Sequence, residues 1–201
     1  MPSRNRRDAA GALHHICFNG NGRSRFILDE RDANTLAQIR TEAALQTSVT
    51  ILSYADLDTH SHVYVRMTEP NLSFFMQLML GRYARAFNKR HEREGHLFQS
   101  PFWSRRTTTE AQLLMALGYI ALNPVRHGLC THPREWARGS YCAIAGLRAP
   151  AGRVDAAATL DVFVPGDIEA ARREYVALID AWCTRVHTRE RREEVAAQAP
   201  G

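Results

Sequence analysis

The order of the predicted secondary-structure elements restricts the fold of this 201-residue chain more than any other feature. Segments rich in β-branched residues favour strands, and segments with apolar residues every three or four positions favour helices. From the N-terminus the order is strand, helix, strand, strand, helix and extended segment, at residues 13–18, 29–46, 49–54, 61–67, 70–88 and 95–103. This order is typical of a ferredoxin-like α+β fold, in which helices lie on the faces of an antiparallel sheet.

Two further helices are expected after this unit. The segment Thr109–Gln112 forms a capping box at the start of the first, and we expect Pro124 to end it because proline lacks the N–H that a helix needs. Asp167 is positioned to cap the second, which is amphipathic. We therefore predict a main domain at residues 1–147, with a basic N-terminal arm. A C-terminal extension at residues 148–201 would comprise a linker, the amphipathic helix and a frayed tail.

Basic side chains are concentrated in one part of the chain. The formal net charge is +5, and residues 82–106 hold seven basic and two acidic side chains, so this segment accounts for the whole excess. A local basic stripe favours a polyanionic partner, although a solvated charged face is the alternative. The basic candidates for contact with such a partner are Arg82, Arg85, Lys89, Arg90, Arg105 and Arg106.

Aromatic residues are interleaved with these cations. Phe98 and Trp103 precede the last two arginines, and this mixture suits single-stranded or hairpin nucleic acid, whose bases stack while its phosphates are neutralised. Tyr83, in the basic helix, is a further candidate for stacking on a base. A core strand followed by a charged turn is the alternative.

Composition argues against several other classes of protein. No apolar run approaches the roughly 20 residues of a membrane span, and the N-terminus lacks the apolar stretch of a secretory signal. The four cysteines are scattered without a C-x-x-C pair, so we expect reduced structural thiols. These features predict a cytoplasmic protein, either a monomer or a homodimer, with no membrane partner.

The segment His60-Ser61-His62 is the first candidate for chemistry. Residues i and i+2 of a strand point to the same side of a sheet, so both imidazoles can reach one metal ion while Ser61 faces away. Two packed or surface histidines are the alternative, because such a pair arises easily by chance.

Tyr119 and Asn123 are the second candidate. They are i, i+4 neighbours on the predicted helix, and Tyr119 falls outside the apolar stripe of that helix. The alternative is a packing tyrosine followed by an asparagine that caps the last turn. Among the other tyrosines, Tyr83 is the rival for the role of nucleophile.

Two histidines, an asparagine and a tyrosine together are typical of a phosphodiester-cleaving site. A tyrosine hydroxyl has a pKa of about 10 and is a weak nucleophile without activation. A divalent ion, Mg²⁺ or Mn²⁺, bound by His60, His62 and Asn123 would polarise the scissile phosphate. Tyr119 would attack phosphorus, release a 3′-OH and keep a 5′-phosphotyrosine link, which a second 3′-OH can reverse. The residues therefore predict a DNA strand-transfer enzyme.

The chain also resembles the REP-associated tyrosine transposases, relatives of the single-strand insertion-sequence transposases in the HUH nuclease superfamily. The likeness is carried by seven segments, His14-His-Ile16, Asn19-Gly-Asn21, Tyr83-Ala-x-x-Phe-Asn88, Gly95-His-Leu-Phe-Gln99, Tyr119-Ile-x-Leu-Asn-Pro-Val-Arg126, Gly139-Ser-Tyr141 and, in the tail of longer members, Ala171-Arg-x-x-Tyr175. It implies a ferredoxin-like fold, a metal pair at His60 and His62, Asn123 as third ligand and Tyr119 as nucleophile. It also implies cleavage of single-stranded bacterial DNA beside palindromic repeats that form hairpins, and hence association with the nucleoid.

The chain departs from this pattern at three points. Ser61 stands where the superfamily has a bulky apolar residue, and we expect weaker packing under the metal site. Thr59 replaces a common asparagine, and Ser100-Pro101 replaces a Gly-Arg pair that contacts DNA. None of these changes removes a catalytic group, so we expect an active enzyme. The alternatives are a domesticated DNA-hairpin binder without cleavage and an unrelated RNA-binding ferredoxin-like domain.

Overall fold

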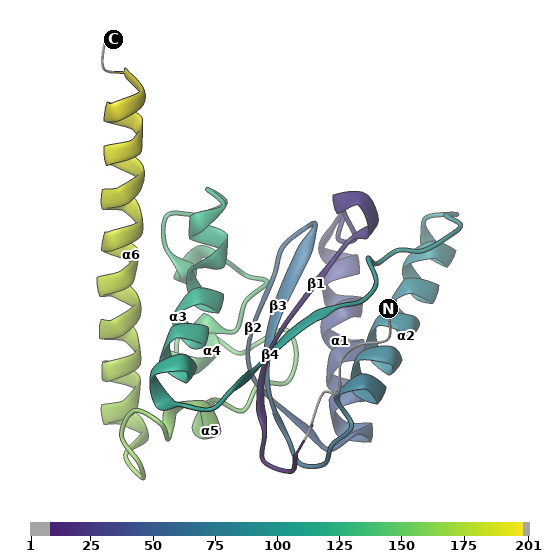
Figure 1. The fold of residues 1–201 in the computed structure, drawn as a ribbon, viewed down its shortest axis with the longest axis horizontal. Coiled ribbons are helices and arrows are strands. Elements are labelled where there is room, and N and C mark those ends of the chain that lie inside the picture. Colours follow the sequence, from purple (N-terminus) through teal and green to yellow (C-terminus); the bar gives the residue numbers. More distant parts are fainter. Residues whose placement is uncertain (1–8, 199–201) are drawn as a thin grey trace.

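The structure is a computed structural model that describes residues 9–198, with side chains as far as residue 188 (Figure 1). Its strands are β1 (Leu13–Asn19), β2 (Val49–Asp56), β3 (His60–Met67) and β4 (Trp103–Thr107). Its helices are α1 (Glu30–Gln46), α2 (Leu72–Arg90), α3 (Glu110–Arg126), α4 (Tyr141–Ile144), α5 (Ala156–Leu160) and α6 (Ile168–Gln198). Within residues 9–198, no helix combines the length and the apolar character that crossing a bilayer requires.

The four strands form one antiparallel sheet in the order β2-β3-β1-β4. The hairpin β2–β3 and the two helical connections through α1 and α2 produce this order. It is the strand order of a ferredoxin-like fold, and it confirms the predicted α+β architecture.

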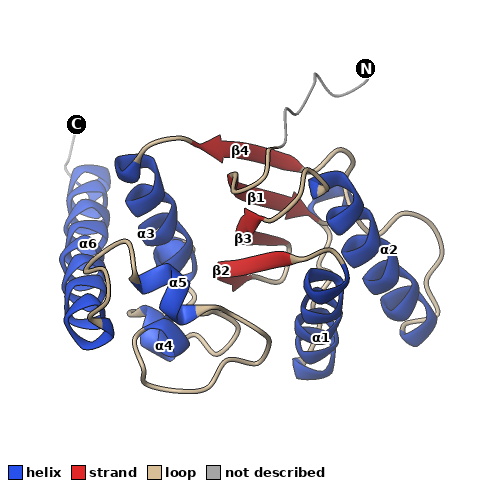
Figure 2. Ribbon diagram, turned by 90° about the horizontal axis from the view of Figure 1, so that it is seen from below, coloured by secondary structure: helices blue, strands red, loops and turns tan. Residues whose placement is uncertain are grey.

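The sheet separates two layers of helices (Figure 2). Helices α1 and α2 pack on one face, while α3, the short helices and α6 lie on the other. Side chains alternate between the two faces along each strand. On β3, Val63, Val65 and Met67 join the core under α1 and α2, whereas His60 and His62 face α3.

Helix α6 lies along α3 and extends beyond the rest of the fold (Figure 1). Its start is capped as predicted, since the Ala170 N–H donates to Asp167 Oδ1 at 2.9 Å. Gly118 permits the close approach of the two helices, because a Cβ at this position would lie 2.1 Å from the Trp182 indole. The C-terminal extension therefore supports the helix that carries Tyr119.

The fourth strand lies later in the chain than predicted. We expected the extended segment at residues 95–103, but β4 covers Trp103–Thr107 and pairs with Leu13–Cys17 of β1. Residues 95–102 form a loop that joins the sheet only through a bridge between Gly20 and Phe98. The reason is physical: Pro101 has no N–H for a ladder, while the charged β4 is tolerated because it is an edge strand.

The prediction that Pro124 ends its helix was also wrong. Helix α3 continues to Arg126, because the His127 N–H still reaches the Asn123 carbonyl at 3.2 Å and closes one more turn. Proline removes one helical hydrogen bond, which is tolerable so close to the end of a helix.

The C-terminal extension is more ordered than expected. The predicted frayed tail is helical to Gln198, and residues 199–201 lie outside the described part, as do residues 1–8 of the predicted basic arm. The predicted linker packs on the main domain, since the Asp155 N–H donates to the Ile51 carbonyl at 2.8 Å and Thr159 Oγ1 donates to the Leu52 carbonyl at 2.7 Å. The domain boundary at residue 147 stays a prediction.

Candidate active site

Strand β3 carries the two histidines on the face that α3 covers. Antiparallel pairing sets His62 opposite Cys17 and His60 opposite Asn19 of β1. His62 is buried, whereas His60 is half-buried at the end of the strand. Ser61 faces the other layer, as the alternation of the strand predicts.

Helix α3 brings Asn123 and Tyr119 to these histidines. Asn123 is 1% exposed, and its Oδ1 lies 3.0 Å from Nε2 of His60. Tyr119, one turn earlier, is 36% exposed, and its ring centroid lies 5.1 Å from that of His62. All four residues predicted for the metal site and the nucleophile therefore lie in one cluster between β3 and α3.

Burial keeps the histidines of this cluster neutral. Loss of solvent, together with the nearby imidazoles of His15 and His60, lowers the pKa of His62 to about 3. Burial also lowers the pKa of His60, although its hydrogen bond to Asn123 opposes this shift. A neutral imidazole has a free lone pair, which is the form that binds a metal ion.

His15, on β1, is a part of the cluster that pattern analysis did not single out as a functional residue. Its Nε2 lies 3.1 Å from Nδ1 of His62, and its ring contacts those of Tyr119 and Trp103 at centroid distances of 5.8 and 5.3 Å. Burial, together with the charge of Arg105, lowers the pKa of His15 to about 4. Strand pairing could have identified His15. In any register that sets Cys17 opposite His62, His15 lies on the same face of the sheet as His62.

Three more side chains surround the predicted residues. The ring of His127 lies 4.8 Å from that of His60, and the guanidinium of Arg126 lies 5.2 Å from the Tyr119 ring. Cys17 Sγ lies 3.9 Å from Nε2 of His62, and burial raises the pKa of this thiol to about 11, so it is protonated at neutral pH. Arg126 is the cation closest to Tyr119 among the contacts described for its ring.

The site is backed by a buried polar network on the α1 side of the sheet. Asp56, at the end of β2, accepts hydrogen bonds from Arg40 at 2.8 and 2.9 Å and from Ser61 at 2.6 Å. The Arg40 guanidinium also lies 3.8 Å above the ring of Tyr54. These side chains are fully buried, so the segment between the two histidines is anchored by hydrogen bonds.

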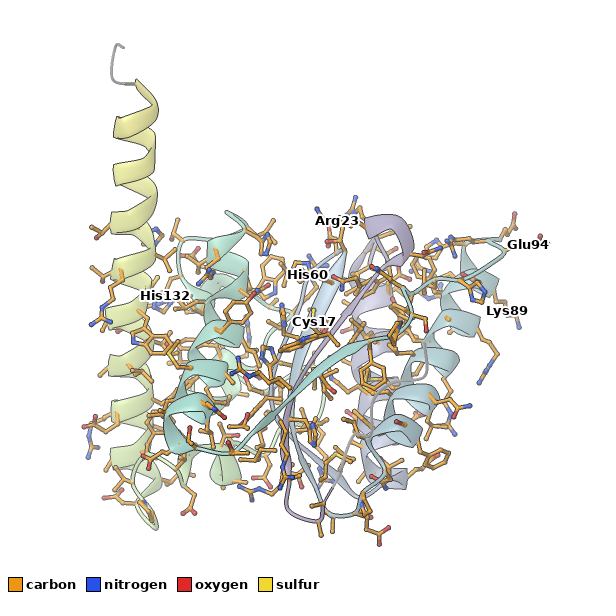
Figure 3. All side chains as sticks on the ribbon, viewed as in Figure 1. Cys17, Arg23, His60, Lys89, Glu94 and His132 are labelled. Atoms are coloured by element: carbon orange, nitrogen blue, oxygen red, sulfur yellow. The ribbon has the colours of Figure 1, made fainter. Side chains whose placement is uncertain are left out.

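The basic segment does not form one surface. Arg82, Arg85, Lys89 and Arg90 belong to α2, on the opposite face of the sheet from His60 (Figure 3). Arg82 donates to Gln46, and Arg90 donates to both Asp29 and Asp32, whereas Arg85 and Lys89 are exposed. The prediction of a single basic stripe was therefore wrong for Arg105, because this residue of the edge strand β4 points to the α3 face of the sheet, whereas α2 covers the other face.

The proposed stacking role of Tyr83 is also contradicted. Tyr83 lies on the inner side of α2, where its side chain is fully buried and its hydroxyl donates to the Phe26 carbonyl at 2.6 Å. No ring face is open to a base, and burial raises the pKa of the phenol far above its usual range. Tyr83 is a core residue, which also removes it as the rival nucleophile.

An open cleft borders Tyr119 between β4 and α3, with a volume of about 660 Å³. The sheet side is lined by His15, Trp103 and Arg105, and the helix side by Met115 and Tyr119. Arg106 follows on β4 but alternates to the other face, opposite His14. Of the predicted DNA contacts, Trp103 and Arg105 are therefore the two that line the cleft beside Tyr119.

Comparison with known proteins adds an independent observation. The family model of IS200-like transposases matches residues 10–123. No curated protein matches the chain. A solved structure of a REP-associated tyrosine transposase bound to a REP hairpin is similar over 78% of this chain and 93% of that chain, with 18% sequence identity and a TM-score of 0.63. A proposed transposase of Deinococcus radiodurans R1 is similar over 56% of this chain and 92% of that chain, with 15% identity and a TM-score of 0.43.

Proposed function

The chain belongs to the IS200-like transposase family, and we propose that it cleaves and rejoins single-stranded DNA beside hairpins through Tyr119 and a divalent metal. One observation carries the proposal: Tyr119 is 36% exposed, and its ring contacts the neutral imidazole of His62. Beside His62, the imidazole of His60 is hydrogen-bonded to the amide oxygen of Asn123. Family membership also argues against an unrelated RNA-binding domain.

His60, His62 and Asn123 are the residues that would hold the ion. Among residues 9–188, no group of three or more His, Cys, Asp or Glu side chains has the arrangement of a metal site, and in this proposal the Asn123 amide supplies the third ligand. The 3.0 Å separation of His60 Nε2 and Asn123 Oδ1 matches two neighbouring ligands at about 2.1 Å from one octahedral ion. Asn123 Nδ2 is buried without a hydrogen-bond partner, which fits an amide held by its oxygen. Bound there, Mg²⁺ or Mn²⁺ would supply Lewis-acid polarisation of the phosphoryl group.

Tyr119 would perform the covalent step. Its phenolic oxygen forms a bond to phosphorus while the bond from phosphorus to the 3′-oxygen breaks, and the phenol loses its proton as the 3′-oxygen gains one. The 5′-phosphate stays on the tyrosine, so a second 3′-OH can attack the same phosphorus and restore the phenol. Arg126 sets a positive charge next to the ring, where it favours a bound phosphate.

The substrate class follows from the surroundings of Tyr119. Trp103 and Arg105 border the nucleophile with an exposed indole and a cation, which suits an unpaired strand. The related transposase of known structure is bound to a REP hairpin, and we extend this preference to the present chain. We further propose that it acts in the bacterial cytoplasm at the nucleoid, as a monomer or a homodimer.

A covalent adduct tests the proposal. Hairpins with labelled single-stranded flanks, taken from the DNA around the gene, are incubated with the protein and Mg²⁺ or Mn²⁺ and resolved on a denaturing gel. We expect a protein–DNA adduct that requires the metal and is absent in Tyr119→Phe. Tight binding without an adduct across several flanks would support the domesticated hairpin binder instead.

A further inference from the structure

We propose that the cleft between β4 and α3 holds one unpaired nucleobase, that of the nucleotide directly attached to the scissile phosphate. This inference rests on the proposed function and adds a base-binding site to it. The cleft is open along one side of Tyr119, and its volume of about 660 Å³ leaves room for a nucleotide.

The walls of the cleft expose apolar side chains that a folded protein ordinarily buries. Trp103 is 49% exposed, Met115 is 60% exposed, and the ring of Tyr119 is 36% exposed. Isolated exposed apolar residues need no explanation, but three that line one cleft mark a binding surface. An indole on one side and a thioether on the other provide polarisable surfaces between which a flat aromatic ring can stack.

The charge of the cleft identifies the occupant as a nucleotide. Arg105 is the one charged side chain among its lining residues, and the Arg126 guanidinium lies over the Tyr119 ring, 5.2 Å from the ring centroid. No acidic side chain lines this part of the described chain. An apolar slot with cations at its rim is complementary to a base that carries phosphates on either side.

Side-chain contacts fix the cleft next to the reacting groups. The Trp103 ring packs edge-on against His15 at 5.3 Å, and His15 in turn contacts both Tyr119 and His62. A single imidazole therefore separates the indole from the nucleophile and from the proposed metal ligand. A base stacked on Trp103 belongs to a nucleotide that adjoins the phosphate under attack.

Equilibrium binding with abasic substrates tests the site. Tyr119→Phe protein is titrated with hairpins whose flank carries one abasic nucleotide, moved one position at a time through the cleavage site mapped with the parent protein. We expect a loss of affinity of about tenfold at one position next to the scissile phosphate and smaller losses elsewhere. In Tyr119→Phe/Trp103→Ala protein, this penalty should disappear, because the stacking partner is gone.

Control variants separate the possible failures. Phe74→Ala removes an exposed aromatic of α2 on the other face of the sheet, and the penalty should persist. Met115→Ala should reduce the abasic penalty, and Trp103→Phe, which keeps an aromatic ring, should retain it. These two variants keep the test valid if Trp103→Ala does not fold. A penalty that survives Trp103→Ala would overturn the base site while leaving the proposed function intact.

Other outcomes are equally informative. Failure of every hairpin to bind would overturn the proposed function and this inference together. Normal cleavage with a flat abasic scan would overturn this inference alone. A change of sedimentation coefficient on Trp103→Ala, without an abasic effect, would assign the cleft to a second copy of the chain and likewise overturn the base site.

Discussion

The hydroxyl of Ser61 donates a 2.6 Å hydrogen bond to Oδ1 of Asp56, directly behind the strand segment that presents His60 and His62. Asp56 is held in turn by two hydrogen bonds from the buried guanidinium of Arg40. A bulky apolar residue would be typical of the superfamily at position 61. In this chain Ser61 takes part in a buried polar network, where it adds a third hydrogen bond to the Asp56 carboxylate.

Breaking this network should destabilise the protein strongly. Asp56→Ala leaves the Arg40 charge buried without its partner, and we expect the free energy of unfolding to fall by about 3–5 kcal/mol. Ser61→Ala removes one hydrogen bond to a carboxylate that keeps its arginine, and should cost about 1–2 kcal/mol. Urea denaturation followed by circular dichroism measures both. Asp58→Ala, which breaks partly exposed ion pairs with Arg25 and Arg138, should cost less than about 1 kcal/mol for each pair. Equal losses for Asp56→Ala and Asp58→Ala would contradict the network's role.

The choice between two tyrosines gives a second prediction. Tyr119→Phe should abolish the covalent adduct and leave hairpin affinity within about threefold, because the variant loses only the hydroxyl. Tyr83→Phe should form the adduct at the parent level while losing about 1 kcal/mol of stability, since its buried hydroxyl donates to a carbonyl. Denaturing gels and urea titrations of the two variants provide the measurement. A covalent adduct formed by Tyr119→Phe protein would show that another residue is the nucleophile.

The sequence predicted those features of the fold and of the site that depend on local periodicity. The order of the elements, the common face of His60 and His62 and the adjacency of Tyr119 and Asn123 follow from repeats of 2 and 3.6 residues. What local patterns do not contain is the pairing of distant segments. His15 joined the cluster through antiparallel pairing of β1 with β3, and the arginines of α2 were separated from Tyr119 by the crossing of the chain between two faces. Tyr83 was predicted to lie on the surface of the basic helix. Its burial depends on contacts with the segment around Phe26, which is distant in the sequence.

His15 should tune the metal site without binding the ion itself. Its hydrogen bond to His62 orients that imidazole, and loss of such an outer contact typically weakens metal affinity by about 10–100-fold. We expect His15→Ala to reduce Mn²⁺ affinity by this factor in calorimetric titrations without DNA, and His62→Ala to abolish binding. The matched control is His91→Ala, at the residue that directly follows α2, which should bind Mn²⁺ like the parent. Parent-like affinity in His15→Ala would mean that the contact does not orient His62.

The buried imidazoles also predict an acid-sensitive fold. The pKa of His62 is lowered to about 3 and that of His15 to about 4, whereas both titrate near 6.5 in an unfolded chain. Between pH 6.5 and about 4 the unfolded chain binds protons that the folded chain does not. The free energy of unfolding of the metal-free protein should therefore fall as the pH drops through this window, by about 1 kcal/mol per pH unit for each histidine.

Urea titrations at pH 7, 6 and 5 in the presence of a chelator measure this slope. His62→Gln should flatten it, because one of the two buried groups no longer titrates. His96→Gln replaces an exposed histidine and should leave the parent's slope unchanged. A slope that is the same in His62→Gln and in the parent would show that His62 is not the group responsible.

Salt dependence distinguishes the arginine in the cleft from one that is already paired. Hairpin affinity should fall steeply with salt concentration, because each phosphate contact releases counterions. Arg105 lies beside Tyr119 in the cleft, so Arg105→Gln should weaken binding and reduce the slope of log affinity against log salt by about 0.7, the value for one contact to a single strand. Arg90 is held by Asp29 and Asp32 on the other face of the sheet, and Arg90→Gln should leave the slope unchanged. Fluorescence anisotropy at salt concentrations from about 50 to 300 mM measures this slope for both variants. If Arg90→Gln lowered the slope and Arg105→Gln did not, the DNA would bind along α2. The cleft beside Tyr119 would then not be the DNA-binding site.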